Sequence, residues 1–553
     1  MINYDLEKQS IDSQNITILI TAAGSIKSAC NYKLALDEPA FLNIGTSLAI
    51  DEIKKKAKSK IILALNKNLP GLTKFRPFDN IDLVEIGATN NIIETILESL
   101  KYIKTEWCLI NPITTIPTSN DFSYPFIEFG SKKLLQENWS AISIENNKKP
   151  MFFSKSAKST HRILSYPFTG RILAKKDDLE MGIHDLKNEE KKDLINLANN
   201  LFNNCNVQIR FTDWLDIGHI ATYPLTRIGS IKSRFFNKLI FDEEKNIIKK
   251  VSNNKNKIDQ EIGFYRNMPS EIKRFFPSIF NINYRESYIS YQMEYIGYPN
   301  LSEIYLFSEL GPNAILRIFN SIESIVKILY GKKFLIKENV DWLYSKKTKS
   351  RQNDLEEIID KKDFKFLKRF YLFDFKINNI KFPSLKRTFS LLNKELIDFE
   401  INRPLYLGHG DLCFNNILVD PLFGSIKLID PKAEKHKKLN QNGIVDNFYD
   451  LSKLNHSIEG LYDSVVNNLY KIKILEVNNI SLELYKPKEY QLYNNFFKEI
   501  IIEKRINIRE LRLLTANLFL SMLPLHVDDK DRMLVLALIG SIFMSEYSIN
   551  EVI

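Results

Sequence analysis

The sequence predicts an α/β protein in two parts, and three observations support this fold class. Short apolar runs alternate with segments of helical periodicity as far as about Tyr223, which is typical of an α/β sheet. Two apolar runs around charged turns follow between residues 229 and 298, which predicts a small β-rich lobe. From about Asn300 onward the longest segments have helical periodicity, so the second part should be an α+β unit with a β-rich lobe and a large helical lobe.

The length and charge of the chain limit its organisation and its partners. A chain of 553 residues is too long for one hydrophobic core, so several domains are expected. The formal net charge is +10, but the basic residues are spread along the chain rather than gathered in a tail. Such a surplus attracts polyanions such as nucleotides modestly. We therefore expect nucleotides and a small-molecule substrate as partners, and no nucleic acid.

Cysteines and apolar runs indicate the compartment. The four cysteines lie far apart and form no CxxC pair, which argues against a zinc site or a disulfide framework and fits a reducing cytoplasm. The polar N-terminus does not resemble a signal peptide. The longest apolar run, residues 533–544, is too short to span a bilayer and predicts a buried helix. We expect a cytoplasmic protein without a membrane span.

The first part begins with a strand that runs into a turn of small residues, "ITILITAAGSIK" from Ile16. Further short apolar runs lie at residues 60–67, 81–87 and 106–117, and the segment at 90–103 has helical periodicity. Strands that alternate with helices predict a parallel sheet.

The second part begins with a predicted hairpin at residues 234–252, a helix at 256–269 and another hairpin at 282–299. Helical periodicity then dominates. The predicted helices lie at residues 314–329, 384–399 and 449–469, and the charged segment 346–362 is either an exposed helix or a loop.

A hydrophobic hairpin at residues 405–430 interrupts these helices and contains unusual polar residues. Asp411 begins a loop, Asn416 precedes the strand "ILVD", and Asp430 ends the next strand. Two adjacent strands would place Asn416 beside Asp430, with Asp411 opposite. Phosphoryl transfer needs a carboxylate that orients the attacking hydroxyl and hard oxygen ligands that hold Mg²⁺ against the phosphates. The hairpin therefore predicts a base and a magnesium clamp.

The run "HGDLCFNN" followed by "LID" resembles the HxDxxxxN…ID signature of the aminoglycoside phosphotransferase and choline kinase group, which has a protein-kinase-like fold. The resemblance covers residues 229–553. It implies that Asp411 is the catalytic base, that Asn416 and Asp430 bind Mg²⁺, that His409 supports the loop, and that Asp450 buttresses it.

The same resemblance requires an ATP-positioning lysine on a strand and a glutamate on the next helix. "NIIKKVS" offers Lys249 and Lys250, and "DQEIGFY" offers Glu261. Alternation along a strand favours one lysine pointing inward, and we favour Lys250. The resemblance also implies a hinge that meets the adenine, at Met293, Glu294 and Tyr295 in "YQMEYIGYP", and "FDEEKN" stands where a glycine-rich phosphate loop could be.

The N-terminal stretch "ILITAAGSIKSACNYKLAL" resembles the opening of the sugar-phosphate nucleotidyltransferases. The resemblance implies a nucleotide-binding turn at Ala22, Ala23 and Gly24, with Lys33 as the lysine of a Pro-Lys pair. "DWLDIGHIATY" resembles the metal-binding strand end of this family, with Asp216 as the ligand. The second ligand of the family is an aspartate, but Asn111 stands at the matching position.

These resemblances imply a Rossmann-like nucleotidyltransferase domain at residues 1–228 and a kinase-like unit with an N-lobe at 229–298 and a C-lobe at 299–553. The expected enzyme phosphorylates a hydroxyl of a choline, ethanolamine or sugar substrate with ATP and Mg²⁺. The first domain would then attach the product to CTP or UTP, for headgroup activation or the biosynthesis of a surface (capsule) polysaccharide.

Three alternatives remain. In the first, only the kinase is active and the N-terminal domain has lost its activity. In the second, the chain is a nucleotide-binding scaffold without enzymatic activity. The third, an antibiotic-modifying kinase, leaves the first part unexplained and predicts an acidic pocket for a polycation, whereas residues 440–470 are only mildly acidic.

Overall fold

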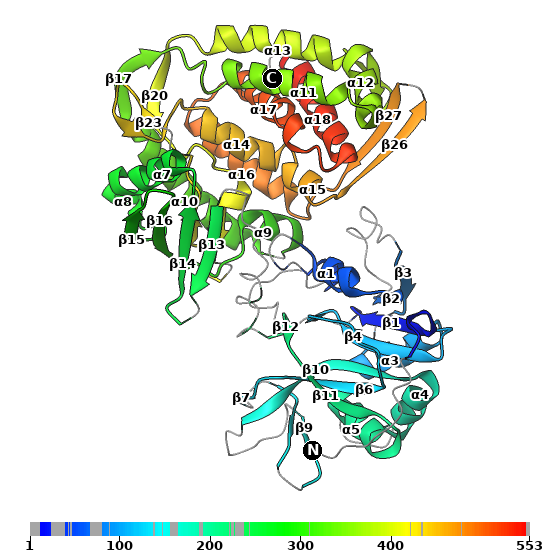
Figure 1. The fold of residues 1–553 in the computed structure, drawn as a ribbon. Coiled ribbons are helices and arrows are strands. Elements are labelled where there is room, and N and C mark those ends of the chain that lie inside the picture. Colours follow the sequence, from blue (N-terminus) through cyan, green and yellow to red (C-terminus); the bar gives the residue numbers. More distant parts are fainter. Residues whose placement is uncertain are drawn as a thin grey trace. The chain divides into compact units, whose positions relative to one another are not determined.

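The computed structural model divides into two compact units, Met1–Lys232 and Ser233–Ile553, which are described separately (Figure 1). The described residues are 11–23, 39–42, 44, 47–66, 80–87, 89–135, 139–145, 148–154, 164–186, 192–219, 222, 226, 237–242, 244–308, 310–420, 422–432, 435–476 and 478–548.

The first unit is built on a mixed sheet whose central path runs in the order β11-β6-β10-β4-β1-β2-β3. Its strands are β1 (Ile16–Thr21), β2 (Lys60–Leu65), β3 (Asp82–Glu85), β4 (Trp107–Pro112), β6 (Phe126–Gly130), β10 (Leu164–Lys175) and β11 (Gln208–Thr212). Three short strands extend this sheet from β10: β7 (Leu134–Leu135), β8 (Ala141–Ser143) and β9 (Met151–Phe153). Two more, β5 (Thr115–Pro117) and β12 (Trp214–Asp216), form a separate two-stranded sheet.

The prediction of a parallel sheet is right for most strands of the central path, including β11, which pairs in parallel with β6, and it is wrong for β10. β1 pairs in parallel with β2 and β4, and β2 pairs in parallel with β3. β10 runs antiparallel to both β4 and β6. The reason lies in the connections, because no helix lies between β4 and β10 in the described chain and parallel neighbours need a long crossover.

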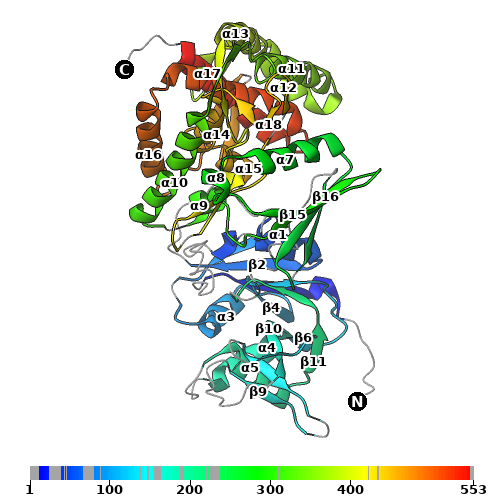
Figure 2. The same ribbon diagram turned by 90° about the vertical axis from the view of Figure 1, so that its left-hand side faces the viewer.

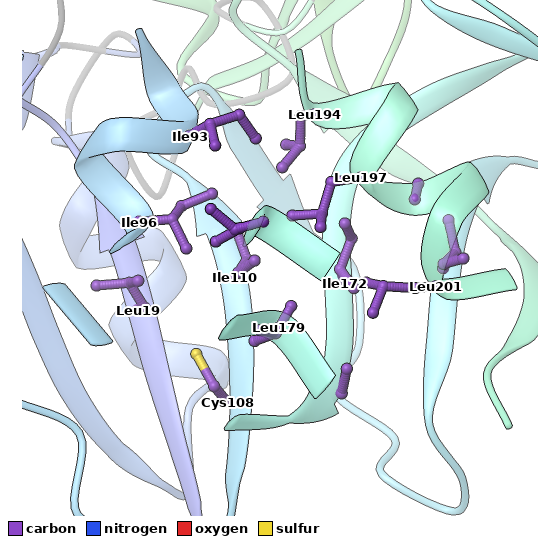
Figure 3. Packing of buried hydrophobic residues seen from close by; sticks show 14 of the residues in the cluster. Leu19, Ile93, Ile96, Cys108, Ile110, Ile172, Leu179, Leu194, Leu197 and Leu201 are labelled. Carbon is purple, nitrogen blue, oxygen red and sulfur yellow. The ribbon is translucent and has the colours of Figure 1, made fainter. Parts of the chain in front are cut away.

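Helices α3 (Ile92–Leu100), α4 (Lys176–Asp185) and α5 (Leu194–Asn204) pack their apolar sides on one face of the sheet. Figure 3 shows Ile93 and Ile96 of α3, Leu179 of α4 and Leu197 of α5 turned toward Ile110 and its neighbours on the strands. The helix α1 (Ala49–Lys56) lies across the sheet from them (Figure 1). This core fixes the ends of β1 and β4, where the candidate nucleotide-binding residues lie.

The second unit begins with an antiparallel sheet in the order β13-β14-β16-β15. Its elements are β13 (Asn237–Asp242), β14 (Ile247–Ser252), β15 (Ile279–Tyr284), β16 (Ile289–Glu294), α7 (Lys255–Asn267) and α8 (Ser270–Lys273). Both predicted hairpins and the helix between them are present. Ile258 and Ile262 of α7 pack on Ile289 and Tyr291 of β16, which holds the helix against the sheet.

A larger helical part follows, and its last two helices lie at its centre (Figure 2). The helices are α9 (Leu301–Phe307), α10 (Pro312–Gly331), α11 (Ser345–Ile359), α12 (Lys365–Leu372), α13 (Leu385–Phe399), α14 (Tyr449–Ile458), α15 (Tyr462–Val466), α16 (Tyr490–Glu503), α17 (Ile508–Ser521) and α18 (Lys530–Ser548). The apolar run of residues 533–544 is buried in α18, as predicted. The α/β unit followed by a two-lobed α+β unit is therefore the fold class that the sequence predicts.

Two details of the helical part differ from the prediction. The single helix expected at 449–469 is two helices, because the chain turns at Gly460 and Leu461 takes a left-handed φ of 53°. The part also contains small sheets that helical periodicity does not reveal. Their strands are β17 (Lys333–Glu338), β20 (Arg403–Leu407) and β25 (Ile444–Val445) in one sheet, β18 (Phe375–Ile377), β19 (Ile380–Phe382), β26 (Tyr470–Glu476) and β27 (Asn479–Leu484) in another, and the pair β23 (Lys435–His436) and β24 (Gln441–Asn442).

Candidate active site

The hairpin at 405–430 brings Asp411, Asn416 and Asp430 together. It consists of β21 (Ile417–Val419) and β22 (Ile426–Leu428), which pair antiparallel with Ile417 opposite Leu428. The N–H of Ile429 donates to the carbonyl of Asn416 at 3.0 Å, so Asn416 and Asp430 lie next to each other at the open end of the hairpin. The side-chain amide of Asn416 donates to the carbonyl of Asp411 at 2.9 Å. The loop and the hairpin therefore form one connected group.

The loop before the hairpin is held from beneath by buried Asp450. Its carboxylate accepts hydrogen bonds from the N–H of His409 at 2.7 Å and from the N–H of Gly410 at 2.8 Å. Burial raises the pKa of Asp450 to about 6, although both N–H groups favour the carboxylate. Gly410 has a φ of 76°, and a Cβ there would lie 2.4 Å from the carbonyl oxygen of Lys432. This position therefore requires glycine.

His409 lies inside the protein and stacks on Phe276, with ring centroids 6.0 Å apart. Burial lowers its pKa to about 4, so the ring is neutral near pH 7. Its Nδ1 accepts the N–H of Asp411 at 3.3 Å. The histidine thus orients the backbone of Asp411 and does not itself reach an open site.

Two lysines that the sequence analysis did not identify hold the carboxylate of Asp411. Lys432 Nζ lies 2.8 Å from Oδ2, and Lys453 Nζ lies 3.0 Å from Oδ1. Burial opposes ionisation of Asp411, but these two charges outweigh it and hold its pKa well below the usual range. A sequence signal exists for Lys453, since it follows Asp450 by three residues and therefore shares its face of α14.

Lys250 of β14 joins the β-rich lobe to this group. Its Nζ lies 2.8 Å from both carboxylate oxygens of Glu261 on α7, and 3.0 Å from Oδ1 of Asp430. Tyr291 donates its hydroxyl to Glu261 at 2.7 Å. Burial disfavours the charged lysine, but the two carboxylates outweigh it and raise its pKa. Lys249 is partly exposed and points to the other side of the strand.

The three residues predicted to form the hinge, Met293, Glu294 and Tyr295, lie at the end of β16 and directly after it. Met293 packs on the core of the β-rich lobe. The N–H of Glu294 donates to Ser278 and the N–H of Tyr295 donates to Asn246, at 3.0 and 3.1 Å. These two backbone donors are therefore engaged within the lobe.

The donors at the hairpin suit Mg²⁺. Asn416 and Asp430 offer hard oxygen atoms, and the side chain of Asp430 is half exposed. Within the described ranges no group of three or more His, Cys, Asp or Glu side chains could hold a metal by itself. Magnesium usually takes one or two carboxylates together with phosphate oxygens and water, so two protein ligands fit it when it arrives with ATP.

In the first unit, the end of β4 brings Asn111 toward Asp216. The amide of Asn111 donates to the carbonyls of Pro112 and Thr115, both at 2.9 Å, and Thr115 pairs with Asp216 across β5 and β12. Asn111 is wholly buried, and its Oδ1 accepts no hydrogen bond in the described part. Asp216 accepts the N–H of Gly218 at 3.0 Å, together with bonds from two further side chains, His219 and Thr222.

The remaining predicted residues of the first unit lie around β1. Ala22 and Ala23 follow the end of β1 directly, and β1 pairs with β4 so that Ile20 lies opposite Asn111. Gly24 and Lys33 lie outside the described residues. The described part of this unit therefore offers one carboxylate, already hydrogen-bonded, where the expected metal site needs two.

Comparisons with known proteins return both groups that the sequence resembles. The chain is similar to UTP-bound UGPase from Acinetobacter baumannii (TM-score 0.31, 9% identity, 38% of this chain and 92% of that one). It is similar to 4-diphosphocytidyl-2C-methyl-D-erythritol synthase from Anaerococcus prevotii (TM-score 0.28, 15% identity, 40% and 97%). It is also similar to a thermostable mutant of aminoglycoside phosphotransferase APH(4)-Ia (TM-score 0.36, 11% identity, 58% and 96%).

No protein-family model matches the chain, and neither does any curated protein. Among the described helices, none is both long and apolar enough to cross a membrane.

Proposed function

We propose that residues 233–553 form an ATP-dependent kinase that phosphorylates a hydroxyl group of a small molecule. The observation that carries this proposal is the contact of Lys250 with both Glu261 and Asp430, which connects a phosphate-positioning lysine to the Asp411–Asn416–Asp430 group. A scaffold that only binds nucleotides has no need of a carboxylate held at Asp411.

In the proposed reaction, Asp411 accepts the hydrogen bond of the acceptor hydroxyl and so directs its oxygen toward the γ-phosphorus of ATP. As the new P–O bond forms, the bond from phosphorus to the β,γ-bridging oxygen breaks and ADP leaves. The hydroxyl proton passes to Asp411. Asn416 and Asp430 would hold Mg²⁺, which neutralises charge on the phosphates, and Lys250 positions the phosphates from the other side.

The acceptor classes that the resemblance implies are choline, ethanolamine and sugars. They can be compared by phosphorus NMR of the full chain with Mg-ATP and pooled alcohols, with Asp411→Asn as the control. A new phosphomonoester signal that the variant does not produce supports the kinase. Unchanged ATP in every pool, or equal signals from both proteins, would refute it.

We propose a nucleotide-binding role for residues 1–232, and two versions of it differ in their chemistry. An active nucleotidyltransferase would join the phosphorylated product to CTP or UTP, which suits the activation of headgroups or sugars for a surface polysaccharide. The buried amide of Asn111 favours the other version, a domain that binds a nucleotide but does not transfer it, because two carboxylates normally balance Mg-NTP.

Incubating the full chain with the phosphorylated product and either CTP or UTP distinguishes a domain that transfers the nucleotide from one that only binds it. A diphosphate diester signal together with pyrophosphate means that the first domain is active. Binding of CTP or UTP by calorimetry without such a signal means that it only binds.

A further inference from the structure

The acceptor side of Asp411 carries more positive charge than its carboxylate can balance. Lys432 follows the hairpin, Lys453 lies on α14 and Lys347 lies on α11, so three separate elements supply the ammonium groups. Lys432 and Lys453 contact the two oxygens of Asp411, and Lys347 donates to the hydroxyl of Tyr449 at 3.4 Å. Among the described residues, Asp411 is the single carboxylate paired with any of the three.

Two members of this group are buried, which fixes part of the charge inside the site. Lys453 is 8% exposed and Tyr449 is 5% exposed. Lysine is rarely buried this deeply without full compensation, since removing an ammonium group from water costs several kcal/mol. Lys453 shares the carboxylate of Asp411 with Lys432, whose side chain is 39% exposed, so the three side chains together keep a net positive charge.

The direction of the pKa shift of Tyr449 agrees with an excess of positive charge at this place. Burial raises the pKa of a tyrosine, yet Lys347, Lys453 and Lys432 together lower the pKa of Tyr449. Positive charge therefore outweighs burial at a point between α11 and Asp411. The phosphates of ATP already have a cationic partner of their own in Lys250, which pairs with Glu261 and Asp430 and does not contact Asp411.

We propose that the acceptor of this kinase is an anion: an alcohol that bears a carboxylate or a phosphate group close to the hydroxyl that is phosphorylated. This inference rests on the proposed kinase function and narrows its substrate class. Lys432 and Lys453 hold Asp411 against the hydroxyl, and Lys347 attracts the anionic group. A cationic acceptor such as choline, ethanolamine or an aminoglycoside would meet repulsion from the same three groups.

Matched acceptors test the proposal on the full chain with Mg-ATP. One set is glycerol, glycerate and glycerol 3-phosphate, and another is glucose, gluconate, glucose 6-phosphate and glucosamine. We expect kcat/KM, measured by ADP release with phosphorus NMR of the product, to be at least about tenfold higher for an anionic member than for the neutral member of its set. The carboxylate and phosphate members show which anion is preferred.

A pair of variants on α11 isolates the contribution of the charge. Lys347→Met should raise KM at least about fivefold for the anionic acceptor and leave kcat and the neutral acceptor unchanged, because an exposed cation acts on binding. Lys349→Met, an exposed lysine on the same helix, is the matched control and should have no effect.

The possible results distinguish a failure of the anionic-acceptor proposal from a failure of the proposed kinase function. Faster phosphorylation of glucosamine, choline or ethanolamine than of any anionic acceptor would leave the kinase standing and overturn the anionic acceptor. An equal effect of Lys347→Met on neutral and anionic acceptors would also overturn it. No acceptor-dependent phosphoester in any set, with ATP unchanged, would overturn the kinase and the inference together.

Discussion

The ammonium group of Lys250 lies 3.0 Å from the carboxylate of Asp430, although the two residues come from different lobes of the second unit. The same ammonium group lies 2.8 Å from Glu261. A lysine that bridges both carboxylates connects the strand proposed to position the ATP phosphates to the residue that would bind Mg²⁺. The proposed reaction depends on this connection.

Replacing Lys250 with Met should remove the phosphate-positioning charge. We expect kcat/KM for ATP to fall about 100-fold or more, which is the usual effect of losing a group that stabilises transition-state charge. Lys249→Met is the matched control on the same strand and should change kcat/KM less than about threefold, since Lys249 points to the other side of the strand. Steady-state kinetics, with thermal unfolding as a check of folding, measures both. Similar losses in the two variants would contradict the assignment.

Magnesium should compete with Lys250 for Asp430. Removal of Mg²⁺ with EDTA is expected to abolish turnover, and Asp430→Asn should weaken the Mg²⁺ dependence of ATP binding about tenfold or more, because a neutral amide attracts the cation less than a carboxylate. Calorimetric titration of ATP at several Mg²⁺ concentrations measures this. An unchanged dependence in Asp430→Asn would place the metal elsewhere.

Lys453→Met should shift the pH profile of the kinase. Lys453 and Lys432 hold the pKa of Asp411 below its usual range, so the unprotonated base persists far into acid. Removing one of these charges raises that pKa, by about one unit or more for an adjacent charge. The loss of kcat on acidification should therefore begin at a higher pH in Lys453→Met than in the parent. The acid limbs of the two kcat profiles, measured between pH 2 and 6 with circular dichroism as a check of folding, test this prediction, and coincident limbs would mean that Lys453 does not act on Asp411.

Gly410→Ala should disrupt the catalytic loop. The new Cβ would lie 2.4 Å from the carbonyl of Lys432 in a backbone of positive φ, so we expect a loss of about 2 kcal/mol of unfolding free energy or more and little remaining activity. Gly331→Ala is the control, because a Cβ there meets nothing within 4 Å and its φ is not in the left-handed region. It should be neutral in chemical denaturation. Equal stability of the two variants would contradict the described loop.

The sequence allowed the hairpin, the Lys250–Glu261 pair and the two-part fold to be predicted, because each depends on local alternation or on a short motif. β14 pairs on both edges with other strands. Alternation along a strand predicts that one of two adjacent lysines turns inward, but it does not decide between Lys249 and Lys250. The turn residues between Asp242 and Asn246 also correctly marked the first hairpin.

The lysines at Asp411 could not be predicted in the same way. Lys432 and Lys453 meet one carboxylate only after the loop, the hairpin and α14 have packed together. In the sequence Lys432 is one lysine among many in a basic chain, and only the spacing of three residues after Asp450 distinguishes Lys453. The antiparallel direction of β10 and the break in the helix at Gly460 were not predicted for a related reason. Both depend on the path of the chain between distant elements, which local periodicity does not reveal.

The central claim is that Asp411 directs phosphoryl transfer from ATP, and one measurement tests it most directly. Phosphorus NMR would follow Mg-ATP and glycerate, gluconate and their phosphate analogues with the parent chain and with Asp411→Asn, while calorimetry checks that both bind ATP. The account predicts an acceptor-dependent phosphoester from the parent and, from a variant that still binds ATP, a rate at least about 100-fold lower. Equal product from the two proteins would contradict it.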